Sequence, residues 1–433
     1  MRILFITSFP PFPIDRTGGG IRSRLLIDAL KKIGSVGIFY LNYRGADHDI
    51  SHELSPLFAD GSLMLEQSVK IGGQGKIYAH ADKALRALGM IWGRKLAAAG
   101  LRVDIGARKA IEDLVASKKY DLVVARLSRP TAVSGLLDVD NIPLIVDADD
   151  WEPSRVTTQL NVVPWYNILV RAYLHRMLGG AEYLGQRILE RADHVFLASE
   201  TDTALISKIT ATTLPNLPLS NDGGEIVRLS QSNAKSRILF AVGQWSKAQN
   251  SDGMSWFIEN SWPLILRKVP EARLRIAGSV SDALSKVWKR RKNLDLLGFI
   301  DDLTPEYEQA AAVVAPITWG GGTKIKVLEA LAYGRVPVGT SHAFDGLADE
   351  PILNDVVVKS DDAEKLADGA VKLLCDHDFR SSQEIMTLKY YGDNYSISCF
   401  NEIVAKTVKS VVPAPRDSGG VATKQKRFFG PTR

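Results

Sequence analysis

The chain has few of the residues from which disulfide-stapled or metal-dependent proteins are built. Among its 433 residues only Cys375 and Cys399 are cysteines, and the seven histidines show no metal-ligand spacing. This composition excludes a disulfide framework and a cysteine zinc cluster, and it fits a reducing cytosol. The histidines also offer no Ser/His/Asp arrangement for nucleophilic catalysis.

Long apolar runs and a strong charge of one sign are lacking as well. The opening residues, MRILFITSFPPFP, hold an apolar run that is too short for a signal peptide or a membrane span. A net charge of +5 is too mild to indicate a nucleic-acid partner. We therefore expect a cytoplasmic protein that binds no nucleic acid.

Short apolar runs alternate with helical patterns in both halves of the chain, which is typical of parallel α/β sheets. The clearest expected strands cover residues 2–7, 36–41, 122–125, 144–147 and 194–198, then 237–242, 272–277, 294–297, 312–316 and 336–340. The length leaves room for two such domains with a core each. We predict an α/β protein of two Rossmann-like domains, with ligands at the carboxyl ends of the strands in a cleft between them.

The predicted domain limits follow changes in composition. They are an N-terminal domain over residues 1–219, a polar linker over 220–235 and a C-terminal domain over 236–385. A C-terminal helix over 386–412 is expected to pack back toward the N-terminal domain. The residues from Pro413 onward are rich in Pro, Gly, Ser and basic side chains, which predicts a disordered basic tail over 413–433.

The most informative segment begins with three glycines that follow an apolar run, Gly320 to Gly322. A helix pattern starts directly after them, with Thr323 as the expected N-cap. Bare backbone N–H groups at a helix N-terminus, flanked by Lys324 and Lys326, suit a phosphate or diphosphate.

Glu329 makes this segment more specific. It lies six residues past Thr323, about 9 Å along the helix axis. A carboxylate at that distance from an anion site can accept hydrogen bonds from both hydroxyls of a sugar diol. A nucleoside diphosphate would fit both groups, with its phosphates at the glycines and its ribose at Glu329. The simpler alternative is a glycine-capped helix with a solvated glutamate.

A second glycine run, Gly18, Gly19 and Gly20, follows the first expected strand and precedes a helix. It scans as a dinucleotide fingerprint, but the next strand ends without the acidic residue that would hold an NAD ribose. Arg22 and Arg24 lie close enough in sequence to reach an anion there, and a solvated helix face is the alternative.

Three carboxylates end the buried strand IPLIVD and point toward the expected cleft: Asp147, Asp149 and Asp150. Such a cluster can bind a metal, orient an acceptor hydroxyl or cap the next helix. We favour Asp149 for acceptor positioning or proton acceptance, and a structural cap and a metal site remain open.

The second half of the chain resembles a known enzyme family over nearly the whole domain. The matching segments, in order, are FAVGQW (240–245), LRIAG (274–278), LGFIDDL (297–303) and the glycine loop with KVLEALAYGRVPVGT (326–340). They resemble the retaining GT-B glycosyltransferases related to sucrose-phosphate synthase and bacterial mannosyltransferases (glycosyl transferases group 1). The first half matches more loosely, through its glycine run and SETDTALI followed by Pro215-Asn216.

The resemblance implies a nucleotide-sugar donor on the C-terminal domain and an acceptor on the N-terminal one. Carried over by position, the donor-side residues are Glu329 for the ribose, Gly321, Gly322, Thr323 and Lys324 for the diphosphate, Gly243 and Lys247 on the opposite wall, and Gly298 and Phe299 near the base. The residues on the acceptor or diphosphate side are Gly18, Gly19, Gly20, Arg22, Asp147 and Asp150.

Two positions depart from the family pattern. The family usually has a glutamate eight residues before the second one, in contact with the transferred sugar, and here that position is Gly321. The usual arginine of the first phosphate loop falls near Gln244, so cationic support must come from Lys247, Lys324 or Lys326.

We predict a GT-B glycosyltransferase that moves a sugar from a nucleotide diphosphate to a hydroxyl of a glycan or lipid-linked acceptor. Retention of configuration and a place in surface polysaccharide or glycoconjugate synthesis follow from the resemblance alone. The predicted catalytic residues are Asp149, Lys324 and Lys247. No metal and no cofactor are expected, because the nucleotide sugar is a substrate. The alternatives are a non-catalytic nucleotide-binding protein and a nucleotide-sugar epimerase.

Residues 70–110 hold nine Lys or Arg and two Asp, with apolar residues interspersed. Such a stretch can rest on an anionic membrane surface, which predicts peripheral contact at the inner face of a membrane. A surface helix pair with a solvated basic face is the alternative.

Overall fold

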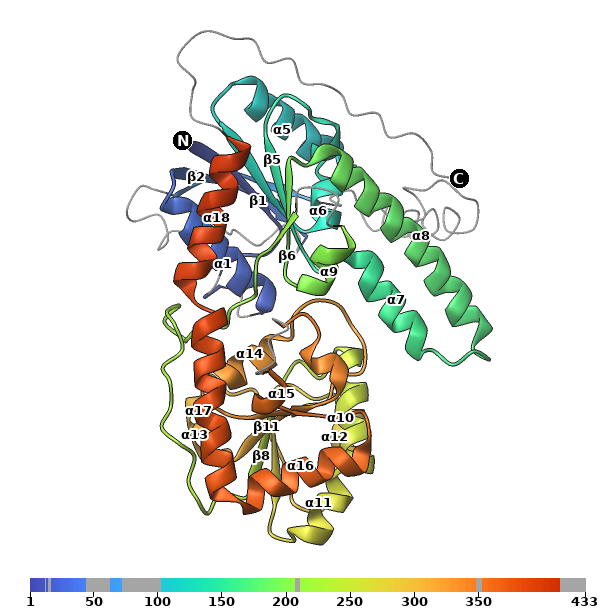
Figure 1. Ribbon diagram of the computed structural model, residues 1–433. Helices are drawn as coiled ribbons and strands as arrows, with labels where there is room; N and C mark the ends of the chain where they lie inside the picture. Colours follow the sequence, from blue (N-terminus) through green and yellow to red (C-terminus); the bar gives the residue numbers. More distant parts are fainter. Residues whose placement is uncertain are drawn as a thin grey trace.

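The computed structural model describes residues 1–11, 13–14, 17–43, 63–71, 103–206, 211–347 and 353–412. Within these ranges the chain forms two parallel sheets, one from each half of the sequence (Figure 1). The strand order is β3-β2-β1-β4-β5-β6-β7 in the first sheet and β10-β9-β8-β11-β12-β13 in the second. Every pair of hydrogen-bonded strands is parallel. The predicted pair of parallel α/β sheets is therefore confirmed.

The first sheet and its helices cover the N-terminal half. The strands are β1 (Arg2–Thr7), β2 (Ser35–Asn42), β3 (Leu63–Lys70), β4 (Leu122–Arg126), β5 (Leu144–Asp149), β6 (His194–Leu197) and β7 (Ala211–Thr213). The helices are α1 (Gly18–Lys31), α5 (Ile105–Ala116), α6 (Ser128–Val133), the 3₁₀ turn η2 (Leu136–Asp138), α7 (Glu152–Val162), α8 (Ile168–Arg191) and α9 (Glu200–Leu205).

The second sheet follows the same plan. Its strands are β8 (Ile238–Val242), β9 (Arg273–Ala277), β10 (Leu294–Gly298), β11 (Ala312–Ala315), β12 (Pro337–Gly339) and β13 (Val358–Lys359). Its helices are α10 (Ala248–Asn260), α11 (Trp262–Lys268), α12 (Asp282–Trp288), α13 (Thr304–Gln309), α14 (Ile325–Ala332), the 3₁₀ turn η3 (Ser341–Phe344), α15 (Leu353–Val356) and α16 (Ala363–Cys375).

The polar segment 220–235, expected as a linker, has no regular structure but is fixed against the second half of the chain. Arg380 donates through Nε to Ser232 Oγ at 2.8 Å, and Arg335 donates through Nη1 to the carbonyl oxygen of Ser230 at 3.0 Å. Both arginine side chains are buried. Hydrogen bonds from buried guanidinium groups therefore hold this backbone in place.

The C-terminal end of the described chain returns to the first sheet. The single helix expected over 386–412 is two helices, α17 (His377–Asn394) and α18 (Ile397–Val411), separated at Tyr395. Helix α17 packs on α14, and α18 packs on α1 (Figure 1). One hydrophobic cluster thus runs from Phe5 in β1 through Phe400 in α18 to Leu328 in α14. The two sheets share part of their core, which holds them in one arrangement.

No helix among the described residues combines the length and the apolar composition that crossing a bilayer requires. The predicted tail over 413–433 lies outside the described residues, and so does most of the basic stretch, over 72–102. The domain limits inferred from the sequence stay predictions.

Candidate functional site at the facing sheet edges

The two sheets meet at the carboxyl ends of their strands, close to the positions where strand order reverses. These switch points lie between β1 and β4 and between β8 and β11, and ligands of open parallel sheets bind there. Thr323 Oγ1 donates to the carbonyl oxygen of Ala198 at 3.0 Å, and Gly320 N donates to Thr158 Oγ1 at 3.3 Å. These contacts join the glycine loop after β11 to the end of β6 and to the middle of α7.

On the donor side, three glycines bring neighbouring strand ends close together. Gly243 N donates to the carbonyl oxygen of Ala277 at 3.2 Å, and Gly278 N donates to that of Gly298 at 2.6 Å. A methyl group on Gly278 would lie 2.0 Å from the Gly243 carbonyl oxygen, so no larger residue fits there. Gly298 itself has φ +72° and open space beside it, and the Phe299 side chain is 69% exposed next to it.

Lys326 is the cation nearest to this glycine-lined edge. Its Nζ donates to Asn250 Oδ1 at 2.7 Å and lies 5.5 Å from the centroid of the Trp245 ring. A methyl group on Gly243 would be 3.3 Å from the same Nζ. Burial, together with the charges of Lys324 and Lys247, lowers the pKa of Lys326 to about 7.

Glu329 lies three residues further along α14, one helical turn away on the same face. Its Oε2 accepts a hydrogen bond from the Tyr307 hydroxyl at 3.0 Å, and the Tyr307 ring stacks on Tyr333 at 4.2 Å between centroids. Burial raises the pKa of Glu329 to about 7, against the opposing effects of Tyr307 and Lys326. A single helix therefore presents a cation and a carboxylate side by side at the edge of the second sheet.

The other two predicted donor-side lysines differ from Lys326. The N-cap of α14 is Lys324 rather than the expected Thr323, whose hydroxyl instead bonds Ala198. Lys324 Nζ folds back and donates to the carbonyl oxygens of Gly321 (3.0 Å) and Gly322 (2.6 Å), which stabilises the loop. Lys247 is exposed and close enough to Lys326 to affect its pKa.

The glycine loop lies directly against the N-terminal half. Gly320 (φ +123°) and Gly322 (φ +62°) adopt conformations that favour glycine. A methyl group on Gly322 would be 1.7 Å from Asp150 Oδ1, and one on Gly321 would be 3.0 Å from Cβ of Arg155. The space that a side chain at position 321 would enter is therefore bordered by Arg155 and Asp150.

The first glycine run does not form the loop that the sequence predicts. Gly18, Gly19 and Gly20 are the first turn of α1, because Thr17 takes the N-cap conformation. A methyl group on Gly18 would lie 2.5 Å from Cδ1 of Ile325 in α14, and one on Gly19 would lie 2.6 Å from the Phe9 ring. These two glycines thus serve close packing, in one case across the boundary between the sheets.

Arg22 and Asp147 were expected to face a ligand, and the structure corrects both. Their side chains are fully buried, with Nη2 of Arg22 at 2.7 Å from Asp147 Oδ1. Arg22 Nη1 also donates to the carbonyl oxygen of Leu214 and to Asn216 Oδ1, each at 2.9 Å. Asp147 receives a second ion pair from Arg126 Nη1 at 2.6 Å. Asp147 is thus enclosed within the N-terminal half with its charge paired to two guanidinium groups, and it does not face the cleft.

Asp149 belongs partly to the same network. It adopts φ +62° at the end of β5, accepts from Arg126 Nη2 and from Asn216 Nδ2, both at 3.1 Å, and does not cap α7. Burial acts to raise its pKa, but the charges of Arg22 and Arg126 outweigh it and lower the pKa below the usual value. A carboxylate held ionised in this way is a weak proton acceptor.

Asp150 has the opposite electrostatics. Burial and the neighbouring Asp149 charge raise its pKa to about 6, with Lys324 and Arg155 acting in the other direction. Its side chain borders Gly321 and Gly322 of the glycine loop, whereas Asp147 lies in the buried network. Of the three carboxylates, Asp150 is the one placed to interact with a bound molecule at the boundary between the two sheets.

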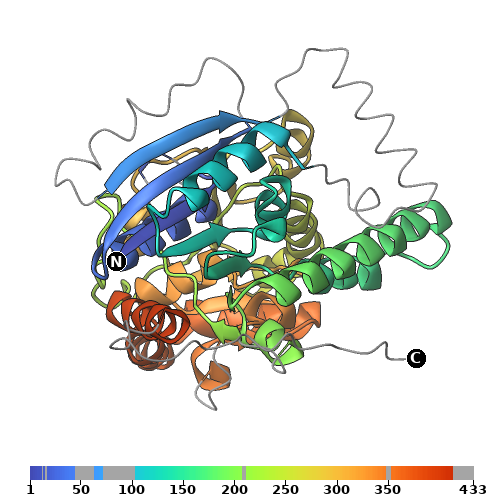
Figure 2. The ribbon, with the colours of Figure 1, turned by 90° about the horizontal axis from the view of Figure 1, so that it is seen from above.

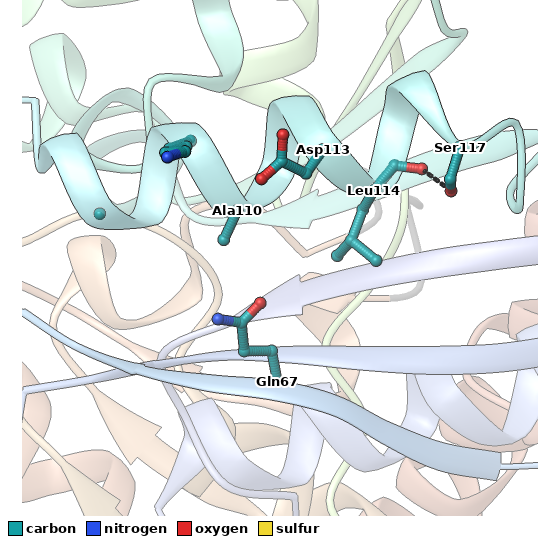
Figure 3. Close-up of a pocket in the computed structure, with 7 residues that line it drawn as sticks. Gln67, Ala110, Asp113, Leu114 and Ser117 are labelled. Carbon is teal, nitrogen blue, oxygen red and sulfur yellow. Dashed lines mark hydrogen bonds between the residues drawn. The ribbon is translucent and has the colours of Figure 1, made fainter.

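A cavity of about 410 Å³ lies elsewhere, between β3 and α5 (Figure 3). Gln67 faces Ala110, Asp113 and Leu114 across it. None of the predicted site residues lines this cavity, so it is separate from the site at the facing sheet edges.

Comparison with known families decides the class of this domain. Residues 236–376 match the family described as Glycosyl transferases group 1. The match lies within the C-terminal half and covers less than half of the 433 residues. The resemblance seen in the sequence is thereby confirmed for this part of the chain.

Solved structures show the fold of the whole chain. Sucrose-phosphate synthase from Thermosynechococcus elongatus is 14% identical with a TM-score of 0.66, over 95% of this chain and 98% of that one. HepE from Anabaena, solved with UDP and glucose, is 14% identical with a TM-score of 0.61, over 95% of this chain and 100% of that one. The GT-B fold predicted from the sequence is confirmed.

The match to a curated relative covers a smaller part of the chain. An uncharacterized 44.6 kDa protein in the cps region of Klebsiella pneumoniae is 25% identical over 117 residues. The match covers 25% of this chain and only 30% of that protein.

Several residues of the site were not singled out from the sequence. Tyr307 holds Glu329, but no spacing rule links residues that far apart in sequence. Asn250 belongs to the segments that resemble the family, but its bond to Lys326 could not be inferred from the sequence. Arg126 had a usable signal, because it directly follows an expected buried strand and is a charged residue at a carboxyl end.

The buried pair gives a prediction for stability. Arg22→Met is expected to lower the free energy of unfolding by about 3–5 kcal/mol, because it leaves the Asp147 carboxylate buried with half of its ion pairs. Urea unfolding followed by circular dichroism measures this change. The matched control is Arg24→Met, which removes a partly exposed i,i+4 pair with Asp28 and is expected to cost at most about 0.5 kcal/mol. Equal losses in the two variants would contradict the structural role of Arg22.

Proposed function

We propose that the chain transfers a sugar from a nucleotide diphosphate sugar to a hydroxyl of a glycan or lipid-linked acceptor, with retention of configuration. The observation that carries this proposal is the pair Lys326 and Glu329 on one face of α14. Lys326 lies at the glycine-lined end of β8, where a diphosphate needs a cation and close backbone approach. Glu329, one turn further, is a hydrogen-bond acceptor for the two ribose hydroxyls.

The remaining parts of a donor fit around this pair. Phe299 offers an exposed aromatic ring beside the open space at Gly298, which suits stacking with a nucleobase. HepE was solved with UDP and glucose, which supports a uridine nucleotide and a hexose as first probes for this chain. The Klebsiella cps-region relative supports surface polysaccharide synthesis as the setting, and we place this synthesis on the cytoplasmic side as part of the proposal.

The chemistry we propose breaks the bond between the anomeric carbon and the diphosphate oxygen, and the diphosphate leaves with the electron pair. The acceptor oxygen attacks the same face of the sugar and passes its proton to the departing diphosphate. No covalent enzyme intermediate is required. Lys326, with Lys247 nearby, offsets the negative charge that develops, so a metal ion is not needed for this step.

We assign the sugar-side carboxylate to Asp150 rather than to Asp149. Asp150 borders Gly321, where the family usually has a glutamate, and it reaches that place from the opposite sheet. Lys324, by contrast, stabilises the glycine loop through its two carbonyl contacts. The chain thus replaces a missing carboxylate with one from the N-terminal half.

The donor site is tested with a carboxylate-to-amide change. Glu329→Gln is expected to weaken UDP binding about tenfold or more, because an amide accepts one ribose hydroxyl poorly and repels a second donor through its NH₂ group. Isothermal titration calorimetry with UDP, GDP, ADP, dTDP and CMP measures the affinities and names the base. The control is Glu259→Gln, an exposed glutamate on α10. Unchanged affinity in folded Glu329→Gln would contradict the ribose role.

Nucleotide affinity is also expected to depend on pH, with a maximum near pH 7. Above it, Lys326 loses its proton, since its pKa is lowered to about 7, and the diphosphate loses its cation. Below it, Glu329 takes up a proton, since its pKa is raised to about 7, and accepts fewer hydroxyl protons. Calorimetric titrations between about pH 5 and pH 9 measure the acidic and the alkaline limb of this pH dependence of the affinity. In Lys326→Met the alkaline limb should disappear, and its persistence would exclude Lys326 as the diphosphate cation.

Asp150 gives a prediction for turnover. Asp150→Asn is expected to leave UDP affinity unchanged and to slow release of nucleoside diphosphate from the donor about 10²-fold, because the sugar or acceptor hydroxyl loses its position. A coupled assay of UDP release from UDP-glucose, with an acceptor mixture, reports the rate. If the wild-type chain binds nucleotide but releases none from any donor and acceptor mixture, the non-catalytic binding protein replaces the transferase. If the nucleotide sugar is converted to an epimeric nucleotide sugar without an acceptor and without net release of nucleoside diphosphate, the epimerase does.

A further inference from the structure

The α7–α8 hairpin projects from the body of the protein, and its tip is apolar. Figures 1 and 2, two perpendicular views, both show these helices extending beyond the first sheet. At the turn and in the first residues of α8, large apolar side chains face solvent. The most exposed are Trp165 (82%), Tyr166 (69%), Ile168 (72%) and Leu169 (85%). No such group occurs on the other described elements, whose exposed large apolar residues are scattered.

The hairpin does not need these tip residues for its own packing. Val156 and Leu160 of α7 pack against Leu174 of α8, and this small core holds the two helices together. Arg171 Nη1 donates to the carbonyl oxygens of Leu160 (3.1 Å) and Val163 (2.9 Å), which fixes the turn. With 24 residues, α8 is about 36 Å long, so the tip stands away from the core on a rigid arm.

The charges around the tip all have one sign. From residue 153 to residue 181 the chain contains no Asp or Glu, whereas it contains Arg155, Arg171 and Arg176. Arg171 also neutralises the carbonyl end of α7, which leaves the positive end of the α8 dipole at the tip. An apolar cap surrounded by positive charge complements an anionic surface that has an apolar interior.

We propose that the α7–α8 tip inserts into the interfacial region of an anionic lipid bilayer. A tryptophan and a tyrosine at the turn are the side chains that prefer the headgroup level of membranes. The tip is the turn between two helices rather than a broad face, so it suits a deformable bilayer better than the self-complementary patch of a homodimer. Ile168 and Leu169 reach deeper, and the net positive charge of the hairpin favours approach to the lipid phosphates.

The same hairpin also reaches the candidate site, through the first two turns of α7. Thr158 of α7 bonds the backbone of Gly320, and Arg155 borders Gly321. Docking of the tip therefore places the site next to the bilayer surface. This consequence rests on the proposed function, and within that proposal it selects a lipid-linked acceptor over a free glycan.

Vesicle binding of the full chain tests the insertion. The wild-type protein is mixed with phosphatidylcholine vesicles with and without phosphatidylglycerol, and bound protein is measured by cosedimentation. Trp165→Ser/Leu169→Ser is expected to weaken binding to the anionic vesicles about tenfold or more, because two apolar side chains no longer enter the membrane. The fluorescence of wild-type protein should shift to the blue on binding, and most of this shift should be lost in Trp165→Phe.

The control variant is Ile105→Ser/Leu205→Ser, which removes two exposed apolar side chains elsewhere in the same half of the chain. It is expected to bind vesicles like wild type. Equal binding by the tip variant and the control would overturn the proposal in favour of the basic segments, and no binding by wild type would overturn it outright. A wild-type dimer without lipid that the tip variant dissociates would assign the tip to a second copy of the chain. UDP affinity, measured on the same samples, should not change, which separates this test from that of the donor site.

Discussion

The buried ion pairs between Arg22, Arg126 and Asp147 are the interaction on which the N-terminal half of the candidate site depends. They join α1, β4 and β5 beneath the edge where the two sheets meet, and Arg22 extends the connection to Asn216 after β7. Two guanidinium groups satisfy one fully buried carboxylate and also lower the pKa of Asp149. These ion pairs fix the position of the end of β5. Asp150, which follows Asp149, is therefore held at the edge of this network, against the glycine loop.

Close approach of backbone is the second constraint. A methyl group on Gly18 would displace the end of the Ile325 side chain, and one on Gly322 would displace the Asp150 carboxylate. Both positions lie where one half of the chain touches the other. Glycine at these places lets the two sheet edges come together, and the hydrogen bond from Thr323 to Ala198 then fixes their relative position. The glycines that the sequence pattern assigns to phosphate binding, Gly18 and Gly322 among them, thus also allow the two halves of the chain to make contact.

Much of the fold was accessible from the sequence, because buried strands are short apolar runs and parallel sheets require alternation with helices. The glycine loop and Glu329 could also be located, since both follow directly from one local pattern. What the sequence did not reveal are long-range partners. The burial of Arg22 depends on Asp147 and Asn216, which lie 125 and 194 residues away, and a local pattern looks the same for a solvated arginine. The choice between Lys324 and Lys326 likewise depends on Asn250 and Trp245, which only the folded chain brings near.

The absence of a glutamate at Gly321 acquires a physical meaning from the proposed role of Asp150. A carboxylate on the donor domain is present whether or not the two halves are closed. A carboxylate supplied by Asp150 reaches the sugar only when the glycine loop and the end of β5 are in contact, as they are here. The reactive arrangement would then assemble only on closure, when water is also excluded and charge interactions strengthen. The hairpin that borders Gly321 also carries the exposed apolar tip. One rigid pair of helices therefore links the contact that completes the site to the residues proposed to meet the membrane.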